Sequence, residues 1–440
     1  MQLSESQMKK RSVVVIVLIF LLPLVAPAFI GGGVESLTLQ TVKTLISDDY
    51  ERVFQVHQST FERGWFNSRS RIELTIDGLE EVAGTPIAVI LEMDISHGPF
   101  LPTSDGLKLG LAYAVIEPTF EGTGAEGLTT FSKLQSNNAL ISLLATIDGQ
   151  VEINVEAEKM QTDSNLGQLT IEGLRGSSRI VEGESAEAAF TLDYLAIATT
   201  NGSIDIMVQD LEFSGSEFEM SQAISTGESH FSIASLVSSA PLPMTINSLV
   251  ASHSLANARN AQDALELSQV FSIEDLDWDL PVKSLQWRFQ FGNLSRELVA
   301  NYMQLIQNSQ QSGIQLAAAG QSLLIELLGE NLVFDNSLDM QAFGGDHSLQ
   351  VNLSWPGVTG VNTLNTLEPQ LALQMIQVQL TLDANYSALM SSPFAQTVID
   401  YERPGFLLID NGRVKSNIRL TDGVLDINGQ LTPLEQFVNL

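Results

Sequence analysis

Residues 150–156 read Gln-Val-Glu-Ile-Asn-Val-Glu, with polar and apolar side chains in strict alternation. Successive side chains of a β-strand point to opposite faces of its sheet, so Val151, Ile153 and Val155 would share one face and the polar residues the other. This pattern is typical of an antiparallel sheet that has one face on a core and the other in solvent. It decides the fold class.

The same alternation recurs along the chain, in residues 71–76, 203–208 and 347–354. Pairs of Asp or Asn with Gly lie at the ends of such segments, at 77–78, 148–149 and 201–202, and these dipeptides favour the tight turns of β-hairpins. The segment 371–382 differs, because its apolar residues change phase between Met375 and Ile376. We interpret that change as a β-bulge in a long, bent strand, which predicts a curved sheet.

Helical spacing of apolar residues appears only late in the chain. It covers Leu294 to Ile306, a helix-forming run at 317–328, and residues 385–401, which Pro393 interrupts. We expect these helices to cover the open face of the sheet, with a mobile lid over an apolar groove as the alternative. The fold class is therefore β-rich (α+β), with a long curved antiparallel sheet and a few helices in the C-terminal third.

The N-terminus carries a candidate membrane segment. Lys9, Lys10 and Arg11 precede an apolar run from Val13 to Ile30 that contains no charge. A basic flank before a run of this length predicts a transmembrane or signal segment, and the cations tend to stay cytoplasmic. Ala26-Pro27-Ala28 fits a signal-peptidase site, but the run just reaches spanning length, so we favour a retained single-pass anchor.

Two regions follow from this interpretation. Residues 1–33 form the cytoplasmic basic flank and the anchor or signal peptide, and residues 34–440 form an exported, β-rich domain in the periplasm. The expected location is the bacterial inner membrane.

Composition narrows the functional classes. The chain has 52 Asp and Glu against 21 Lys and Arg, a net charge of −31, so it repels nucleic acid and anionic headgroups. Only 17% of its residues are charged while 44% are apolar, which is not the profile of a disordered acidic chain. The absence of cysteine excludes disulfides, thiol catalysis and thiolate metal sites.

No constellation of catalytic residues is evident. The five histidines share no ligand spacing, and neither a G-x-S-x-G nucleophile turn nor a phosphate-binding loop is present. In a strand, Asp275, Asp277 and Asp279 would line one face and could hold a hard cation such as calcium. We favour a solvated strand face for them, and expect no cofactor. Asp346 and His347 would point to opposite faces and could not act as a pair.

Two short motifs follow the N-terminal segment. Residues 61–68 read Phe-Glu-Arg-Gly-Trp-Phe-Asn-Ser, and residues 94–99 read Asp-Ile-Ser-His-Gly-Pro. Together they resemble the YdgA-like family, a bacterial domain of unknown function numbered 945. The resemblance implies an envelope protein with an N-terminal membrane segment, and it carries over no catalytic residue. The motif residues that it singles out are Arg63, Gly64, Trp65, Phe66, His97, Gly98 and Pro99.

These motifs have physical interpretations of their own. Trp65 and Phe66 beside Arg63 form an amphipathic group, which could seat the domain on a bilayer or line a ligand entrance. We favour a structural role in which the aromatic rings plug the end of the sheet. For His97 we favour a hydrogen-bonding brace in a rigid turn over a catalytic role.

The functional hypotheses come from different classes. The first is a non-enzymatic, membrane-anchored periplasmic protein that holds a lipid or another apolar ligand in a curved sheet. The alternative is an envelope scaffold that binds another envelope protein, and an enzyme of unrecognised type is the least favoured. A continuous apolar lining would support the first, and an exposed apolar patch or edge strand the second.

Overall fold

The computed structural model describes residues 54–76, 87–104, 106–122, 135–137, 140–163, 167–181, 185–221, 224–258, 264–278, 282–307, 325–358, 372 and 374–433. The run Val13–Ile30, Asp279 and most of the predicted helix at 317–328 lie outside these residues. Within the described part no helix is long and apolar enough to span a membrane. The chain divides into two compact units, and the boundary falls within β12 (Asp205–Ser221).

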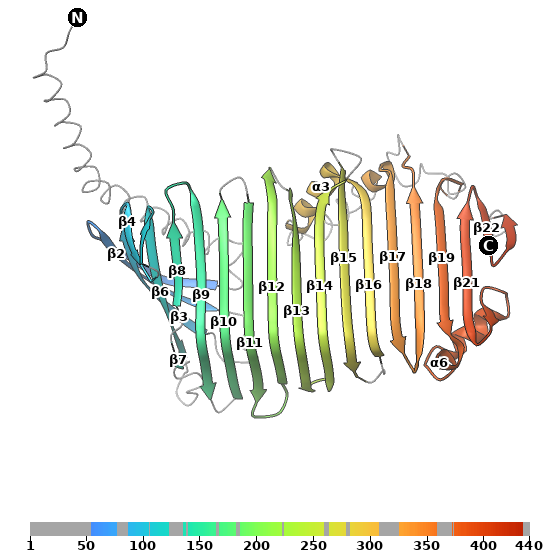
Figure 1. Ribbon diagram of the computed structural model, residues 1–440, viewed down its shortest axis with the longest axis horizontal. Coiled ribbons are helices and arrows are strands. Elements are labelled where there is room, and N and C mark those ends of the chain that lie inside the picture. The colour runs from blue at the N-terminus through green and yellow to red at the C-terminus, as the bar shows by residue number, and fades with distance from the viewer. Residues whose placement is uncertain are drawn as a thin grey trace, which may run out of the picture. The chain divides into compact units, whose positions relative to one another are not determined.

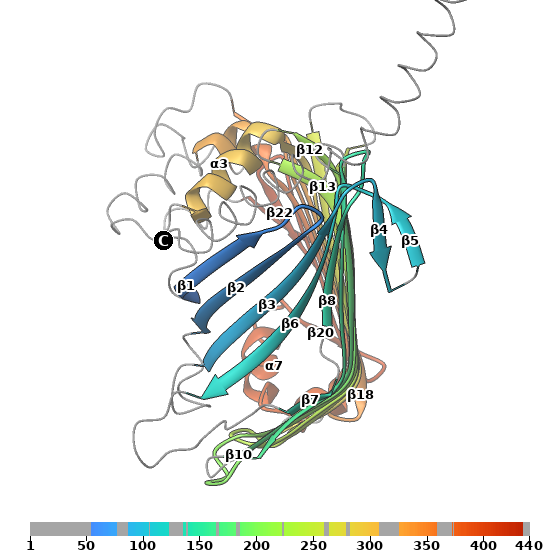
Figure 2. The ribbon, with the colours of Figure 1, turned by 90° about the vertical axis from the view of Figure 1, so that its left-hand side faces the viewer.

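The first unit is a β-sheet built from the N-terminal half of the chain. Its strands are β1 (Phe54–Arg63), β2 (Asn67–Ile76), β3 (Ile87–His97), β4 (Phe100–Thr103), β5 (Gly106–Leu109), β6 (Ala112–Gly122), β7 (Gln135–Asn137), β8 (Leu140–Ala145), β9 (Gln150–Asp163), β10 (Gly167–Val181) and β11 (Ser185–Thr199). Antiparallel pairing runs in the order β1–β2–β3–β6–β8–β9–β10, and β7 pairs with the far end of β9. The strands β4 and β5 form a separate hairpin (Figure 2).

The second unit is also built from antiparallel strands. Its strands are β13 (Ile224–Ala240), β14 (Met244–Asn257), β15 (Ala264–Asp277), β16 (Val282–Ser295), β17 (Leu332–Ala342), β18 (Gly345–Trp355), β19 (Gln377–Asn385), β20 (Leu408–Asp410), β21 (Arg413–Thr421), β22 (Val424–Ile427) and β23 (Gln430–Pro433). From β13 to β19 each strand pairs antiparallel with the next, and β19 pairs with β21, which carries β20 and the β22–β23 hairpin (Figure 1).

The described helices belong to the second unit. They are α3 (Arg296–Gln307), α6 (Tyr386–Met390) and α7 (Ala395–Glu402), and residues 325–329 are also helical. The break between α6 and α7 contains Pro393, as the sequence predicts, because proline cannot donate the backbone hydrogen bond that would continue the helix. Asn385 caps α6 by accepting a hydrogen bond from the backbone N–H of Ala388 at 2.9 Å.

The predicted β-rich class with antiparallel strands and few helices is confirmed. The bulge predicted at Met375–Ile376 is wrong, because residues 374–375 are helical and the backbone N–H of Ile376 donates to the carbonyl oxygen of Ala372 at 3.0 Å. Strand β19 begins only at Gln377. The change of phase in the apolar residues therefore marks a junction from helix to strand, where the period changes from 3.6 to 2.

Candidate functional site

One face of the sheet in the second unit is apolar from β16 to β21. Directly paired residues of antiparallel strands share a face, so the strand registers assign each side chain to one of the two faces. One row of partners runs Trp287–Leu338–Leu349–Leu382, and another, two rows along, runs Phe291–Phe334–Leu353–Val378–Leu420. The remaining members of this face, which we call the apolar face, are Leu285, Phe289, Leu332, Asn336, Met340, Ala342, Gly345, His347, Val351, Trp355, Leu380, Ala384, Val414, Ser416 and Ile418. In these strands the apolar face carries no Asp, Glu, Lys or Arg.

The opposite face of the same strands is polar. Neighbours of the apolar-face residues pair as Gln286–Asp339–Ser348–Asp383–Lys415 across five strands. Arg413 donates to a carboxylate oxygen of Asp383 at 2.6 Å on this side. The division predicted from the period-2 alternation therefore separates an apolar surface from a solvated one.

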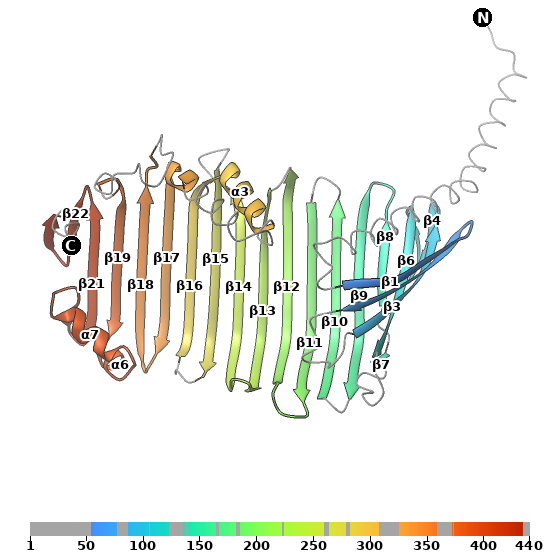
Figure 3. The same cartoon turned by 180° about the vertical axis from the view of Figure 1, so that it is seen from behind.

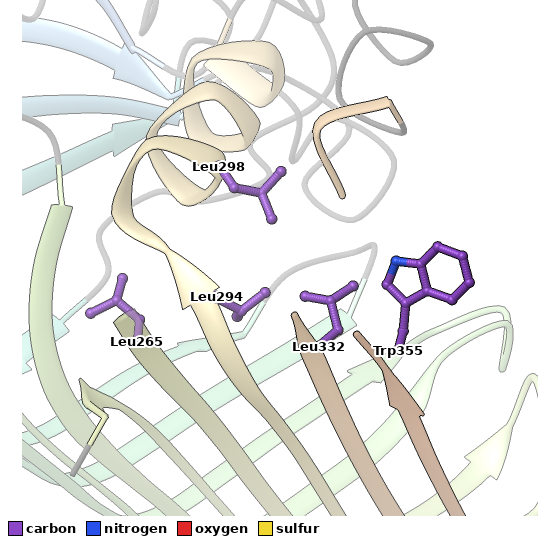
Figure 4. Close-up of a cluster of buried hydrophobic side chains, with 5 residues drawn as sticks. All are labelled: Leu265, Leu294, Leu298, Leu332 and Trp355. Carbon is purple, nitrogen blue, oxygen red and sulfur yellow. The ribbon is translucent and has the colours of Figure 1, made fainter. Parts of the chain in front are cut away.

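The helices lie at the two ends of the apolar face. At one end Leu298 of α3 packs with Leu294, Leu332 and Trp355 (Figure 4), and the indole N–H of Trp355 donates to the carbonyl oxygen of Leu328 at 2.9 Å. At the other end Val398 of α7 packs against residues of β19 and β21, including Ala384 and Val414. Two opposite views show α3 and the α6–α7 pair at different ends of the strands (Figures 1 and 3).

Aromatic rings fill the middle of the apolar face. The ring of Phe289 lies 5.3 Å from that of Phe334 and 6.1 Å from that of Trp287, in edge-to-face contacts. Trp287 is 38% exposed, and its indole N–H donates to the side-chain oxygen of Asn336 at 2.8 Å. Asn336, the polar side chain in the middle of the face, thus has a hydrogen-bond partner, while the rings around it are only half-buried. Such a surface between two helical borders can hold an apolar chain.

The first unit also has an apolar side. Register places Ile72, Leu74, Val89, Leu91 and Ile95 on one face of β2 and β3, and their clusters extend to Ala112 and Ala114 of β6. A hollow of about 1010 Å³ lies in this unit, and its lining includes five carboxylates, those of Glu117, Glu156, Glu158, Glu172 and Asp193.

The structure brings the two N-terminal motifs together. Ser68 pairs with Ile95 across β2 and β3, and the backbone N–H of His97 donates to the carbonyl oxygen of Phe66 at 2.7 Å. His97 is 3% exposed, and its Nε2 lies 2.9 Å from the hydroxyl oxygen of Ser68, which is also buried. His97 is therefore a hydrogen-bonding brace in the structure, as its place in the sequence predicted.

The glycine and proline residues of the motifs shape this junction. A Cβ atom at Gly64 would lie 2.2 Å from the carbonyl oxygen of Asn67, so only glycine fits the turn into β2. Gly98 has a φ of 126°, and its N–H donates to the carbonyl oxygen of Leu111, while the carbonyl oxygen of Pro99 accepts from Gly110. Arg63 ends β1 opposite Ser68.

The expected plug of aromatic rings is not present. Trp65 is 55% exposed and Phe66 is 48% exposed, so neither ring fills the end of the sheet. The turn between β1 and β2 is short, and its side chains project beyond the last paired residues, Arg63 and Ser68. Interpretation from sequence failed here because burial at a strand end depends on which other segments reach it.

The structure describes two of the three residues of the candidate cation site. Asp275 and Asp277 lie in β15 and are exposed, and Asp275 accepts a hydrogen bond from the side chain of Asn247 at 3.3 Å. Asp279 lies outside the described residues. Within the described ranges, no three His, Asp or Glu side chains lie close enough together to hold a metal ion.

Each of the other described histidines hydrogen-bonds to a different partner. His57 hydrogen-bonds to Thr75, His230 to Ser252, His253 to Gln269, and His347 to the backbone carbonyl of Ala342. His347 is buried while Asp346 is exposed, as alternation in the strand requires.

A family model described as a bacterial protein of unknown function, DUF945, matches residues 8–435. The chain belongs to the DUF945 family. No curated protein and no solved structure matches it. The resemblance carried by the two N-terminal motifs is thus confirmed, and in this DUF945 chain the motifs meet where β2 begins and β3 ends, through the buried bond between His97 and Ser68.

Sequence reasoning missed the aromatic rings of the apolar face. A signal was present, because residues 285–291 read Leu-Gln-Trp-Arg-Phe-Gln-Phe with an aromatic or aliphatic side chain at every second position. What the sequence does not contain is the register that sets these rings beside Phe334 of β17.

Proposed function

We propose that this protein is a non-enzymatic, membrane-anchored periplasmic protein that holds the hydrocarbon chain of a lipid on the apolar face of its second unit. The observation that carries the proposal is the composition of that face, which is apolar across β16 to β21 and bordered by helices at both ends. Covering such a surface with hydrocarbon is favourable, by about 25 cal/mol for each Å² of apolar area removed from water.

A lipid suits this surface better than a polar metabolite. The polar side chains on the face are few, and those in its middle are limited to Asn336, which is already bonded to Trp287. Polar ligands need several convergent hydrogen-bonding groups for orientation, whereas an acyl chain needs none. The apolar run Val13–Ile30 would also keep the domain next to a source of lipid.

Two adjacent residues of β18 provide a matched test. Val351 lies on the apolar face and Gln350 on the polar face, so Val351→Lys and Gln350→Lys add the same charge to opposite sides of one strand. An ammonium group cannot be covered by hydrocarbon without a large desolvation cost. We expect Val351→Lys to lower the lipid that copurifies by roughly tenfold or more, a loss of at least about 1.4 kcal/mol, and Gln350→Lys to leave it unchanged.

Native mass spectrometry of protein extracted from its own membrane measures that lipid directly. Melting curves of both variants show whether the fold survives. A second readout uses the partly exposed Trp287. Lipids with brominated chains should quench the total tryptophan fluorescence of the wild-type protein more than that of Trp287→Phe, and the difference reports lipid at Trp287. Equal lipid loss in both lysine variants, or copurification of a protein in place of lipid, would overturn the proposal and favour the scaffold alternative.

A further inference from the structure

The β4–β5 hairpin of the first unit presents an apolar side to the surroundings. Register pairs Phe100 with Leu109 and Pro102 with Leu107, so these four side chains share one side of the hairpin. Leu101 points the other way, is completely buried, and packs with Tyr113 and Leu144 of the sheet. Leu107 and Leu109 are 72% and 60% exposed. The hairpin is therefore fixed to the unit by one side while its apolar side remains uncovered by the described residues.

Other exposed apolar side chains lie at the same end of the unit. The β1–β2 turn carries Trp65 and Phe66, and it is joined to the end of β3 by the hydrogen bond from His97 to Phe66. The backbone N–H of Leu111, which follows the hairpin, donates to the carbonyl oxygen of Ala145, two residues before the exposed Ile147. We call the six residues Trp65, Phe66, Phe100, Leu107, Leu109 and Ile147 the tip patch. Figure 2 shows β2, β3, β4 and β6 meeting at this end.

We propose that the tip patch inserts into the surface of a lipid bilayer and orients the first unit on the membrane. This goes beyond the proposed function, because it concerns the first unit and a bilayer rather than a lipid held on the apolar face. Several exposed apolar side chains gathered at one end of a folded unit mark a candidate interaction site. Trp, as at Trp65, is enriched at membrane–water interfaces, and a neighbouring cation such as Arg63 can extend its charged end toward the water.

The chain itself argues for a bilayer as the occupant. Residues 31–53 separate the apolar run that ends at Ile30 from the start of β1, and an extended segment of that length reaches at most about 80 Å. The tip patch would therefore stay within reach of the membrane that holds the anchor. The two motifs that brace this end, through the His97–Ser68 bond and Gly64, hold the patch residues in place.

Charge sets the salt dependence of this docking. The chain carries a net charge of −31, and Asp148 beside Ile147 keeps its charge because the hydrogen bond from the Thr146 hydroxyl lowers the pKa of that carboxyl. Attachment must therefore come from apolar insertion and work against repulsion by anionic headgroups. Added salt screens that repulsion and should strengthen contact, the opposite of what a basic docking surface shows.

The absence of cysteine allows a direct test in the full-length chain. Leu107→Cys and Leu431→Cys place a single nitroxide label at two leucines that are each 72% exposed, the second in β23 of the second unit. The labelled proteins are reconstituted in vesicles of phosphatidylethanolamine and phosphatidylglycerol. We expect the label at position 107 to collide more with oxygen dissolved in lipid than with a water-soluble nickel chelate, and the label at position 431 to show the reverse.

A second pair of variants tests the patch as a unit. With the label at Ile147→Cys, the double change Leu107→Ser and Leu109→Ser removes apolar surface that would insert into the bilayer, so bilayer contact should fall roughly tenfold or more. Leu431→Ser serves as the matched control and should change nothing. The proposal is overturned if position 107 is exposed to water, if it is shielded from both reagents as under a protein partner, or if salt releases it. Quenching of Trp287 by bound lipid is read separately, so failure here leaves the proposed function standing.

Discussion

The buried bond between His97 and Ser68 ties the first motif to the second. Ser68→Ala removes the hydroxyl partner of the His97 Nε2 atom, so we expect the free energy of unfolding to fall by about 1–3 kcal/mol. Replacing both residues, with His97→Phe and Ser68→Ala, should cost less than the sum of the single changes because no partner is stranded. Urea denaturation measures the four proteins of this cycle.

A neighbouring serine provides the control for that cycle. Ser70 is also buried, but its hydroxyl donates to the backbone carbonyl of Thr60 rather than to His97. Ser70→Ala should therefore destabilise the protein without coupling to His97→Phe. Strict additivity of Ser68→Ala and His97→Phe would contradict the brace, since contacting residues couple by about 0.5–3 kcal/mol.

Two tryptophans with opposite environments test the exposure of the β1–β2 turn. Trp65 is more than half exposed, so Trp65→Ala should change the free energy of unfolding by only about 0.5 kcal/mol. Trp355 is 5% exposed within the cluster at α3, so Trp355→Ala should cost about 3–5 kcal/mol. Thermal or urea unfolding gives both values. A large loss of unfolding free energy in Trp65→Ala would instead indicate that the Trp65 ring is buried at the end of the sheet, as the sequence had led us to expect.

At the scale of elements, the contact between β18 and α6 depends on a glycine. A Cβ atom at Gly345 would lie 2.5 Å from the Cβ of Asn385 and 2.7 Å from that of Ala388. Gly345→Ala should therefore push α6 away from the sheet, with a loss of about 1–3 kcal/mol from overpacking. Gly292→Ala in β16 is the matched control, because its nearest neighbour would be 3.9 Å away. Similar melting temperatures for the two variants would show that α6 adapts without cost.

The acidic run of β15 is expected to act as a strand face rather than as a metal site. Asp275 already accepts from Asn247, and no three ligating groups gather within the described ranges. A chelator should therefore leave the melting temperature unchanged, because a metal that stabilised the native state would make it fall on removal. A drop of several degrees that calcium restores would instead show that Asp275, Asp277 and Asp279 bind a cation.

Helices and strands could be predicted from local sequence where the spacing of apolar residues keeps a single period. Strands such as β9 and β18 follow directly from alternation, and the break between α6 and α7 follows from Pro393. The segment 371–382 could not be interpreted correctly, because a change of phase has the same appearance whether it comes from a bulge or from a turn of helix. Features that depend on residues far apart in the sequence could not be predicted either. The chief examples are the strand registers that assemble the apolar face and the exposure of the tip patch.

At the scale of the whole molecule, the two units share one chemical arrangement, a sheet with an apolar and a polar side. Antiparallel partners satisfy the hydrogen bonding along each sheet, and alternation determines which of its two faces each side chain occupies. Acidic residues lie on the polar faces, as Asp339 and Asp383 do in the second unit. If the chain is exported as proposed, it has no disulfides to stabilise it, and its stability must come from burial.

The N-terminal run supports a prediction about where the molecule resides. Val13–Ile30 follows three cations and contains no charge, so we expect a single-pass anchor with residues 34–440 in the periplasm. The protein should stay with membranes in high salt, because hydrocarbon insertion does not depend on ionic strength, and an external protease should reach it only after the outer compartment is opened. A cytoplasmic enzyme that stays intact under the same treatment is the control. Recovery of a soluble chain that begins at Phe29 would contradict the anchor while leaving export intact, and the tip patch would then be the remaining route to the bilayer.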